Sequence, residues 1–414
     1  MNCHIKAPAG TWQTAVRLPA SKSISNRILI LHMLSKHPCE IRNLSESDDT
    51  EVMRRALQSG ASHIDVGAAG TAMRFLTACL AGRKGTWTLT GTERMKNRPV
   101  KILVDALRTL GAKIDCTGRE GYPPLHIEGR QLQGGEVWLD GGVSSQYVSA
   151  LLMAAPAMTD GLKLHVTGGV ISKPYLHLTV ELMRRFGVNV IEEGQTFTVH
   201  PQPYAAVPFE VEADWSAASY WYELAALAEG AEIELKGLST DSLQGDAAIV
   251  PLFGQLGVET VCTPQGVTLR RNGATRLREA AVNFTDMPDM AQTFAVTCAA
   301  LGVPFRFSGL QSLKIKETDR MSALATELRK FGYVLRERGG STLVWDGSRC
   351  EAESAPVVAT YEDHRMAMAF APMAARVAGG IRMAGVEVVS KSYPGFWDDL
   401  RAAGFDLAEL NVES

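Results

Sequence analysis

The sequence predicts an α/β protein made of six similar units, grouped as two pseudo-symmetric domains of three units each. Six amphipathic helical segments each end in a glycine, and a leucine precedes that glycine by three to five residues. Strand-like runs such as VNVIEE, VETVCT and YVLRER follow most of these segments. The six glycines recur at intervals of 51 to 76 residues, and one sixth of the 414-residue chain is 69 residues. They are Gly60, Gly111, Gly187, Gly257, Gly332 and Gly404.

Each of these glycines is predicted to lie just past a helix, because glycine readily adopts the left-handed conformation that closes the last turn. Two domains would place a ligand site in the cleft between them, where small-molecule sites are often found. The candidate for a crossing between the domains is a weak Gly/Ser/Asp cluster at residues 236–246.

The composition excludes several classes of protein. With 46% hydrophobic and 21% charged residues and a net charge of −3, the chain has no basic excess for nucleic acid or an anionic membrane. No apolar run approaches the roughly 18 residues that a spanning helix needs, and MNCHIKAPAG lacks a signal-peptide core. The seven cysteines include no CxxC pair, which favours reduced thiols in a cytoplasm.

The motifs of the commonest cofactor and metal enzymes are absent. The sequence holds no GxxxxGK[ST] nucleotide cradle, no GxGxxG opening a helix, no HExxH and no GxSxG. The nine histidines are scattered without metal-like spacing. We therefore expect no cofactor and no metal.

What remains is a series of basic residues in apolar, small-residue contexts. In residues 18–34, Ser21 or Ser23 can cap a helix, which places Lys22 and Arg27 where backbone N–H groups and the helix dipole favour an anion. Solvated charges on a capped helix are the alternative. In residues 66–82, Gly70 allows close backbone approach to a ligand, whereas for Arg74 a buried structural ion pair is the favoured interpretation.

Three further segments follow the same logic. Residues 91–107 carry four basic side chains around Pro99, for which a solvated loop is the usual explanation; they are Arg94, Lys96, Arg98 and Lys101. Residues 139–156 and 171–178 place hydroxyl, amide and phenol groups at helix starts, suited to a phosphate or a polyol or to capping alone. These groups belong to Ser144, Ser145, Gln146, Ser172 and Tyr175.

The C-terminal half adds acids to the cations. Asp286 and Asp289 precede an apolar helix, where they can act as caps. In residues 313–332, Lys316 and Arg320 are predicted to share a helix face, with Glu317 between them as a carboxylate that could transfer a proton. An exposed salt-bridge helix is the rival interpretation.

The last two segments bring further candidates from the same half. Asp363, His364 and Arg365 precede a Met/Ala-rich core helix, and Lys391 is predicted at a strand end. Burying so many cations is costly unless polyanionic ligands compensate them. The residues themselves thus predict a cleft enzyme for two small anionic metabolites, at least one of them phosphorylated.

Eight motifs also resemble those of the 5-enolpyruvylshikimate-3-phosphate synthases (3-phosphoshikimate 1-carboxyvinyltransferases), a family of enolpyruvyl transferases. They occur in the family's order and span nearly all of the chain: LPASKSISNR, GAAGTAMR, ERMKNRP, VSSQ, ISKPY, KETDR, DHRMAM and VSKSYP. The resemblance implies two domains, each of three βαββαβ units in an inside-out α/β barrel, with the active site in the interdomain cleft. Residues 1–18 and 240–414 would form one domain and residues 19–239 the other, so the first strand would belong with the C-terminal half.

The reaction implied is transfer of the enolpyruvyl group of phosphoenolpyruvate to the 5-hydroxyl of shikimate 3-phosphate, in aromatic amino acid biosynthesis. By the same resemblance Asp289 is the base, Glu317 the proton carrier at the methylene carbon, and Lys22 an aid. The shikimate 3-phosphate set is Lys22, Ser23, Arg27, Ser144, Ser145, Gln146, Ser172, Asp289, Ser312 and Lys316. The phosphoenolpyruvate set is Lys22, Gly70, Arg98, Gln146, Arg320, Arg365 and Lys391. Supporting residues are Arg74, Tyr175 and His364.

Two positions depart from the family's pattern. Ala68 stands where the family usually has Asn, and Ser312 stands where many members carry Asn. Neither change removes an acid, a base or a cation, so we expect activity with altered affinity.

Two other functions remain as alternatives. The sister family of UDP-N-acetylglucosamine enolpyruvyl transferases should show a reactive cysteine near residues 90–100, and GTERMKNRP has none. A catalytically dead phosphometabolite-binding protein is the other alternative. We expect a cytoplasmic monomer that acts on these two small substrates, without nucleic acid or membrane as a partner.

Overall fold

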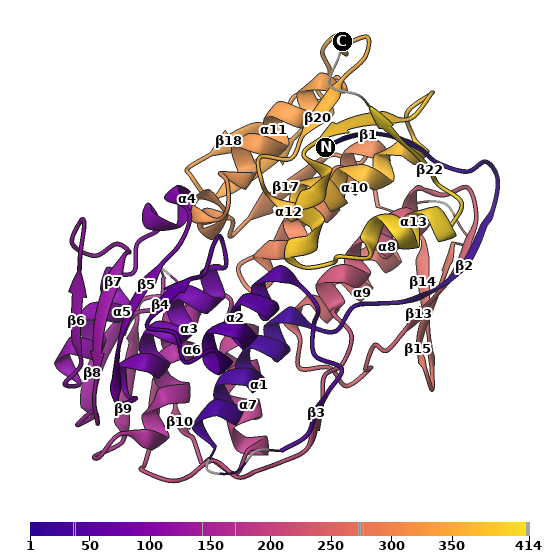
Figure 1. Ribbon diagram of the computed structural model, residues 1–414. Helices are drawn as coiled ribbons and strands as arrows, with labels where there is room; N and C mark the ends of the chain where they lie inside the picture. Colours follow the sequence, from indigo (N-terminus) through magenta and orange to yellow (C-terminus); the bar gives the residue numbers. More distant parts are fainter. Residues whose placement is uncertain are drawn as a thin grey trace. The chain divides into compact units, whose positions relative to one another are not determined.

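The computed structural model describes residues 1–410 except residues 36, 38, 143, 170, 272, 274 and 276. The chain forms two compact units: unit 1 comprises Met1–Pro19 and Glu212–Ser414, and unit 2 comprises Ala20–Val211. In Figure 1, unit 2 runs from indigo to magenta, and most of unit 1 is orange to yellow. The first change of unit lies beside the predicted residue 19, whereas the second lies 28 residues before the predicted residue 240.

Unit 2 holds seven helices and ten strands among its described residues. Its helices are α1 (Lys22–Leu34), α2 (Asp48–Gln58), α3 (Gly70–Ala81), α4 (Glu93–Lys96), α5 (Lys101–Thr109), α6 (Ser145–Ala154) and α7 (Lys173–Arg185). Its strands are β3 (Ile41–Arg42), β4 (His63–Asp65), β5 (Gly85–Thr90), β6 (Lys113–Cys116), β7 (Leu125–Gly129), β8 (Gly135–Asp140), β9 (Leu162–Thr167), β10 (Ile191–Glu193), β11 (Thr196–Val199) and β12 (Phe209–Glu210).

Unit 1 begins with two strands from the N-terminus and continues from residue 212. Its helices are α8 (Trp215–Leu227), α9 (Ile249–Gln255), α10 (Ala291–Ala300), α11 (Arg320–Lys330), α12 (His364–Phe370) and α13 (Phe396–Ala402). Its strands are β1 (Asn2–Lys6), β2 (Trp12–Arg17), β13 (Ala231–Lys236), β14 (Val258–Thr263), β15 (Gly266–Arg271), β16 (Ala280–Asn283), β17 (Phe305–Ser308), β18 (Arg336–Arg338), β19 (Thr342–Trp345), β20 (Val357–Ala359), β21 (Ile381–Ala384) and β22 (Asp406–Leu410).

Five of the sheets share one topology. In the sheet β4-β5-β7-β6, for example, β4 pairs parallel with β5, and the other two pairings are antiparallel. The sheets β8-β9-β11-β10, β16-β17-β19-β18, β2-β13-β15-β14 and β20-β21-β1-β22 repeat this order, and a sixth, two-stranded sheet pairs β3 with β12. The predicted six-fold repetition is therefore present, with one reduced unit. Within one repeat, such as β4-α3-β5-α5-β6-β7, the elements follow in the order βαβαββ. The expected order was βαββαβ, so the two consecutive strands follow the second helix and not the first.

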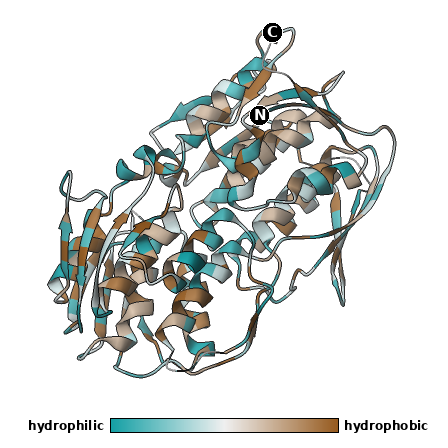
Figure 2. Ribbon diagram, viewed as in Figure 1, coloured by the Kyte–Doolittle hydropathy of each residue, from teal (hydrophilic) through white to brown (hydrophobic). Residues whose placement is uncertain are grey.

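Helices form the inside of each unit and sheets the outside. Nearly all residues of α3, α6, α8, α10 and α12 are buried, as is the middle of α1. The inner helices α1, α3 and α6 contact one another in unit 2, and α8, α10 and α12 do so in unit 1. Strands such as β8 alternate buried and exposed residues, which appears as brown and teal bands on the strands in Figure 2. One face of each such sheet therefore covers the core and the other meets water.

All six predicted helix-ending glycines have the left-handed backbone conformation, with φ between +63° and +98°. They follow the outer helices α2, α5, α7, α9, α11 and α13, one in each of the six repeats. Helix α5, for example, buries one stripe of residues and exposes the other. The glycine pattern in the sequence thus marks the outer helix of every unit.

The N-terminal strand completes a sheet of the C-terminal half. Strand β1 lies between β21 and β22, antiparallel to both, with Cys3 opposite Met383 on one side and Glu409 on the other. Strand β2 pairs parallel with β13. This pairing agrees with the placement of the first strand that the family resemblance implies.

Candidate active site

Several predicted site residues lie at the N-terminal turns of the inner helices. Ser21 caps α1, accepting a hydrogen bond from the amide of Ile24 at 3.5 Å, so Lys22 and Ser23 are the first helical residues. Helix α3 begins at Gly70, and Ser144 caps α6 through the amide of Gln146 at 3.3 Å. Because helix N-termini carry unpaired N–H groups and partial positive charge, these positions suit an anion.

Arg27 is a buried cation whose hydrogen-bond acceptors are neutral. Its guanidinium donates to Thr179 Oγ1 at 2.7 Å, to the carbonyl of Ser23 at 2.8 Å and to that of Tyr175 at 3.2 Å. Only 2% of the residue is exposed, and burial lowers the pKa of Arg27 to about 10. The aromatic ring of Phe75 lies 5.4 Å from its guanidinium carbon. A buried cation held in this way favours an anionic ligand nearby.

Lys22 has an acidic partner, which the sequence pattern did not indicate. Its Nζ lies 3.1 Å from Asp49 Oδ2 at the start of α2, and both side chains are mostly buried. The pairing orients Lys22 and lowers the cost of its charge.

Two arginines crowd the first turn of α3. A Cβ placed on Gly70 would lie 2.7 Å from Arg98 Nη1 and 2.8 Å from Arg74 Nη1. Arg74 donates to the carbonyl of Gly70 at 2.8 Å, and its guanidinium carbon lies 5.4 Å from the ring of Tyr147. The prediction of an ion pair for Arg74 is therefore wrong among the described residues. The guanidinium of Arg74 instead contacts a backbone carbonyl and an aromatic ring. Gln146 Nε2 donates to Thr71 Oγ1 at 3.2 Å, so the first turns of α3 and α6 touch.

The basic residues of segment 91–107 separate into two groups. Lys96 pairs with Glu93 at 2.7 Å and Lys101 with Asp105 at 2.6 Å on the surface, as the solvated-loop interpretation predicts. Arg98, in contrast, turns inward to Gly70. On α7, Ser172 precedes the helix in a left-handed conformation and makes no capping hydrogen bond, while Tyr175 lies beside Arg27.

In unit 1, Asp289 brings three predicted cations together. Its Oδ1 lies 2.7 Å from Arg320 Nη1 and 3.5 Å from Lys316 Nζ, and its Oδ2 lies 3.1 Å from Arg365 Nη2. Asp289 belongs to the 3₁₀ turn Pro288–Met290 and makes no capping bond to α10. Cation binding, and not capping, is therefore its role in the structure. Glu317 joins the group through Arg320 Nη2 at 2.9 Å.

Arg320 is the buried centre of this cluster, and its strongest partner was not assigned a role from the sequence. Asp363 is fully buried and accepts hydrogen bonds from Arg320 Nε at 2.7 Å and Nη2 at 3.3 Å. It also caps α12 by accepting a hydrogen bond from the amide of Arg365 at 2.9 Å. The capping position before the helix is the one sequence signal that could have identified Asp363.

These contacts shift the pKa values of the cluster. Burial raises the pKa of Asp289, but Arg365, Lys316 and Arg320 outweigh it and hold that pKa well below its usual range. Burial lowers the pKa of Lys316, which Asp289 only partly offsets. Asp289 is therefore ionised and a weak base as long as its three cations have no other anion.

Two local predictions for unit 1 are wrong. Lys316 and Arg320 do not share a helix face, because α11 begins at Arg320 and Asp319 caps it through the amide of Ser322 at 3.2 Å. Both cations nevertheless reach Asp289. Lys391 ends the 3₁₀ helix Val386–Lys391 and not a strand, and its Nζ donates to the carbonyl of Glu362 at 2.7 Å.

Two further predicted residues lie close to these elements. His364 is buried as the first residue of α12. The hydroxyl of Ser312 is buried and has no hydrogen-bond partner within the described part of the chain.

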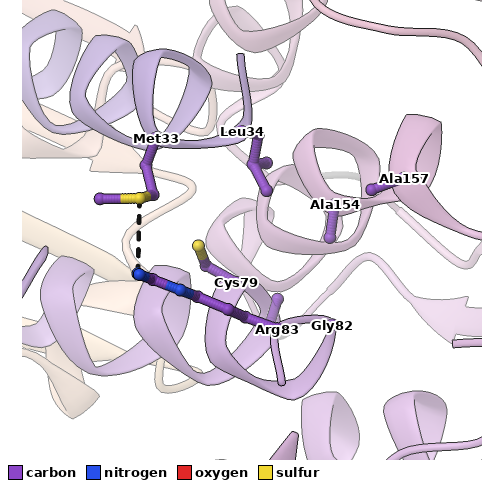
Figure 3. Close-up of a pocket in the computed structure, with 8 residues that line it drawn as sticks. Met33, Leu34, Cys79, Gly82, Arg83, Ala154 and Ala157 are labelled. Carbon is purple, nitrogen blue, oxygen red and sulfur yellow. Dashed lines mark hydrogen bonds between the residues drawn. The ribbon is translucent and has the colours of Figure 1, made fainter. Parts of the chain in front are cut away.

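A separate pocket of about 280 Å³ lies at the C-terminal ends of α1, α3 and α6, where Met33, Cys79 and Ala154 line it (Figure 3). Arg83 reaches across it to the sulfur of Met33 at 3.5 Å. Because the predicted anion-binding residues occupy the opposite ends of the same helices, this mostly apolar pocket is not the candidate active site. In the described ranges no group of three His, Cys, Asp or Glu side chains could hold a metal ion, and no helix is long and apolar enough to span a membrane.

Comparisons with known proteins identify the family to which the chain belongs. The model of the family described as EPSP synthase (3-phosphoshikimate 1-carboxyvinyltransferase) matches residues 7–59 and 55–400. A 3-phosphoshikimate 1-carboxyvinyltransferase of Bacteroides fragilis is 56% identical over 396 residues, covering 95% of this chain and 96% of the relative. The chain belongs to the EPSP synthase family.

More distant EPSP synthases match over similar lengths. The Janthinobacterium sp. enzyme of the same name is 39% identical over 425 residues, covering 94% of this chain and 95% of the relative. The solved structure of EPSP synthase from Acinetobacter baumannii has the same fold, with a TM-score of 0.78 at 21% identity, and the match covers 99% of this chain and all of that one. Membership of the EPSP synthase family confirms the resemblance drawn from the eight motifs.

Proposed function

We propose that the two residue sets bind and convert the substrates of an EPSP synthase, which transfers the enolpyruvyl group of phosphoenolpyruvate to the 5-hydroxyl of shikimate 3-phosphate and releases phosphate. The observation that carries this assignment is Asp289, a carboxylate in contact with three cations and connected to Glu317 through Arg320. The cations supply anion binding, and the two carboxylates supply proton transfer.

Shikimate 3-phosphate is assigned mainly to unit 2. Arg27 offers a buried charge, and the helix starts of α1 and α6 offer hydroxyl and amide groups. Ser23, Ser144, Ser145, Gln146 and Ser172 complete this part. Unit 1 adds Asp289, Lys316 and the buried hydroxyl of Ser312.

Phosphoenolpyruvate carries a phosphate and a carboxylate, so it requires several cations. We assign to it Lys22, Arg98, Arg320, Arg365 and Lys391, with Gly70 leaving room beside Arg98. Arg74, Tyr175 and His364 support these residues. Guanidinium groups suit both anions because they bind them with two parallel hydrogen bonds.

The chemistry is addition followed by elimination. Glu317, aided by Lys22, protonates the methylene carbon of phosphoenolpyruvate, which makes C2 electrophilic. Asp289 accepts the proton of the 5-hydroxyl as its oxygen bonds to C2. Glu317 then takes a proton back from the methyl group of the tetrahedral intermediate as the bond from C2 to the phosphate oxygen breaks, which restores the double bond. Phosphate leaves with the proton that Asp289 had accepted.

Ligand binding would also activate the base. The cations that lower the pKa of Asp289 are those assigned to the substrates' anions. Once a phosphate or carboxylate neutralises Arg365 and Lys316, the pKa of Asp289 rises and its affinity for the hydroxyl proton increases.

The direct test is phosphate release from phosphoenolpyruvate with shikimate 3-phosphate, without added metal or nucleotide. We expect turnover with this acceptor and none with UDP-N-acetylglucosamine. Asp289→Ala should abolish it, whereas Lys101→Ala, which removes an exposed ion pair with Asp105, should leave it unchanged. Binding of both substrates without turnover would identify a dead binding protein instead.

We further propose that the enzyme is a cytoplasmic monomer. Size-exclusion chromatography with light scattering should give a mass near 44.8 kDa. A mass twice that value would refute the monomer and leave the catalytic assignment intact.

A further inference from the structure

A fourth acid lies behind the Asp289 cluster, on a segment that the residue sets above do not use. Asp246 belongs to the 3₁₀ turn Gly245–Ala248 and is 3% exposed. Its Oδ2 accepts a hydrogen bond from the hydroxyl of Ser216, in the first turn of α8. Arg365 Nη2 donates to the same hydroxyl oxygen at 3.4 Å and to Asp289 Oδ2 at 3.1 Å.

The direction of these hydrogen bonds gives Asp246 a function. A serine hydroxyl has one hydrogen and two lone pairs. Because that hydrogen goes to Asp246, the lone pairs of Ser216 are left for Arg365. Without the carboxylate, the hydroxyl can rotate and point its hydrogen at the guanidinium, where two donors repel.

We propose that Asp246 is a positioning residue: through the hydroxyl of Ser216, its carboxylate fixes the guanidinium of Arg365 against Asp289. The inference rests on the proposed function, which assigns Arg365 to phosphoenolpyruvate. It adds a specific role for two residues that neither substrate set includes.

The electrostatic surroundings support an ionised Asp246. The pKa of Asp246 is raised to about 6, and burial is the largest cause. Asp289 and Asp214 also raise this pKa, whereas Arg365 and the Ser216 hydroxyl lower it. At neutral pH the carboxylate therefore carries a charge and accepts the Ser216 hydrogen.

The test compares the apparent KM values of the two substrates in four variants and one control. Asp246→Ala and Ser216→Ala should each raise the KM for phosphoenolpyruvate about tenfold, the scale of losing one hydrogen bond to a charged group. The KM for shikimate 3-phosphate should change less than twofold. Asp246→Asn keeps an oxygen that accepts from Ser216, so it should recover most of the loss.

The double variant Asp246→Ala/Ser216→Ala shows whether Asp246 acts on Arg365 through Ser216, here called the relay, or whether the two residues act independently. If Asp246 acts through Ser216, the double variant should match either single variant, near tenfold. Ser219→Ala is the matched control, since its hydroxyl binds the Ser216 carbonyl at 2.7 Å and does not contact Arg365 in the described contacts. This control should leave both KM values unchanged.

Several results would overturn the relay. A hundredfold effect in the double variant would mean that the residues act independently, and an equal rise in both KM values would mean a general structural role. An Asn variant as impaired as the Ala variant would assign the effect to charge and not to the hydroxyl. If Asp246→Ala does not fold, Asp246→Asn and Ser216→Ala still decide the question. Loss of all turnover in the wild type would instead refute the proposed function.

Discussion

Arg320 shows how a single residue can organise a cluster of charged side chains. Its guanidinium is 2% exposed and meets three carboxylates, Asp289, Glu317 and Asp363. Burying a cation is costly, and each carboxylate offsets part of that cost. Since all of its acids come from different segments, Arg320 holds the start of α11 against the start of α12.

Glu317→Gln tests the proton carrier. The amide keeps an oxygen that can accept from Arg320 but cannot transfer a proton, so turnover should fall by about 10² or more while both substrates still bind. Turnover is measured by phosphate release and binding by calorimetry. Glu337→Gln, which changes only an exposed pair with Lys314, is the control. Near-normal turnover in Glu317→Gln would move the acid–base role to another group.

Gly70→Ala tests the crowded turn of α3. The new methyl group would meet the guanidiniums of Arg98 and Arg74 closer than 3 Å, so both must shift. The family resemblance implies that glyphosate, an inhibitor longer than phosphoenolpyruvate, occupies the same site. We therefore expect a higher KM for phosphoenolpyruvate and a larger loss of inhibition by glyphosate. Inhibition constants and KM values measured side by side decide this. Equal losses for both ligands would contradict the placement of this loop beside the phosphoenolpyruvate site.

At the residue scale, the sequence predicts which residues belong to the charged cluster better than it predicts their partners. The motifs identified Asp289 and Arg320, but Asp289 also had the position of a helix cap, and only the fold brings together residues 31 positions apart. The pairing of Lys22 with Asp49 and the turn of Arg98 toward Gly70 depend on tertiary packing in the same way.

At the scale of helices, the terminal glycines differ in how tightly they are packed. Gly60 has φ +63° and open space where a side-chain Cβ would lie, so alanine there should cost about 1 kcal/mol of unfolding free energy. At Gly332, with φ +86°, a Cβ would also lie 2.9 Å from the carbonyl of Cys350. Gly332→Ala should therefore destabilise more than Gly60→Ala, as measured by urea unfolding.

Gly254→Ala should change the unfolding free energy in the opposite direction. Gly254 lies within α9, outside the left-handed region and with open space around it, so alanine should stabilise by about 0.5–1 kcal/mol. Destabilisation there, or equal costs at Gly60 and Gly332, would contradict the argument from conformation and packing.

Glu223 on α8 gives a prediction about pH. It is fully buried, and burial raises its pKa well above the usual value, while the nearby side chain of Thr297 opposes this only in part. The folded state therefore keeps its proton to higher pH than the unfolded state, and stability falls as pH rises above about 4.3, the pKa in the unfolded chain.

Glu223→Gln removes this titration. The stability of the variant relative to wild type should increase between pH 5 and pH 8, by at most about 1.4 kcal/mol for each pH unit. Urea unfolding at both pH values measures the difference, and other groups cancel because they titrate in both proteins. Parallel pH dependence would show that Glu223 is ionised in the folded state.

The elements were predictable where a local signal fixes them. Glycine and the apolar period located the outer helices, because both act within a few residues. The start of α11 was misplaced because the spacing of Lys316 and Arg320 fits a helix as well as it fits the turn that Asp319 ends. The two-stranded sheet β3-β12 leaves no comparable local signal, since its strands are two residues long and 168 positions apart at Ile41 and Phe209.

At the scale of the whole molecule, unit 2 is a continuous segment with its own core. Residues 20–211 expressed alone should unfold in one cooperative thermal transition, because the described contacts make this segment compact by itself. The fragment should bind shikimate 3-phosphate at least tenfold more weakly than the full chain, since Asp289, Ser312 and Lys316 lie in unit 1.

Circular dichroism and calorimetry measure the two properties of this fragment. Arg27→Ala in the fragment should abolish the remaining binding, because it removes the buried cation. A fragment without a cooperative transition would show that unit 2 needs unit 1 in order to fold.

The pairing of β1 with β21 and β22 determines how late in synthesis this sheet can form. Residues 2–6 are made nearly 400 residues before their partners, residues 381–384 and 406–410. At 5–20 residues per second this delay is roughly 20–80 s, during which all of unit 2 has been translated. Strand β1 must stay unpaired throughout this delay, and β2 until its partner β13 is made. An unpaired strand is a template for wrong association. Lys6 and Arg17, at the ends of these strands, are the kind of charge that discourages it.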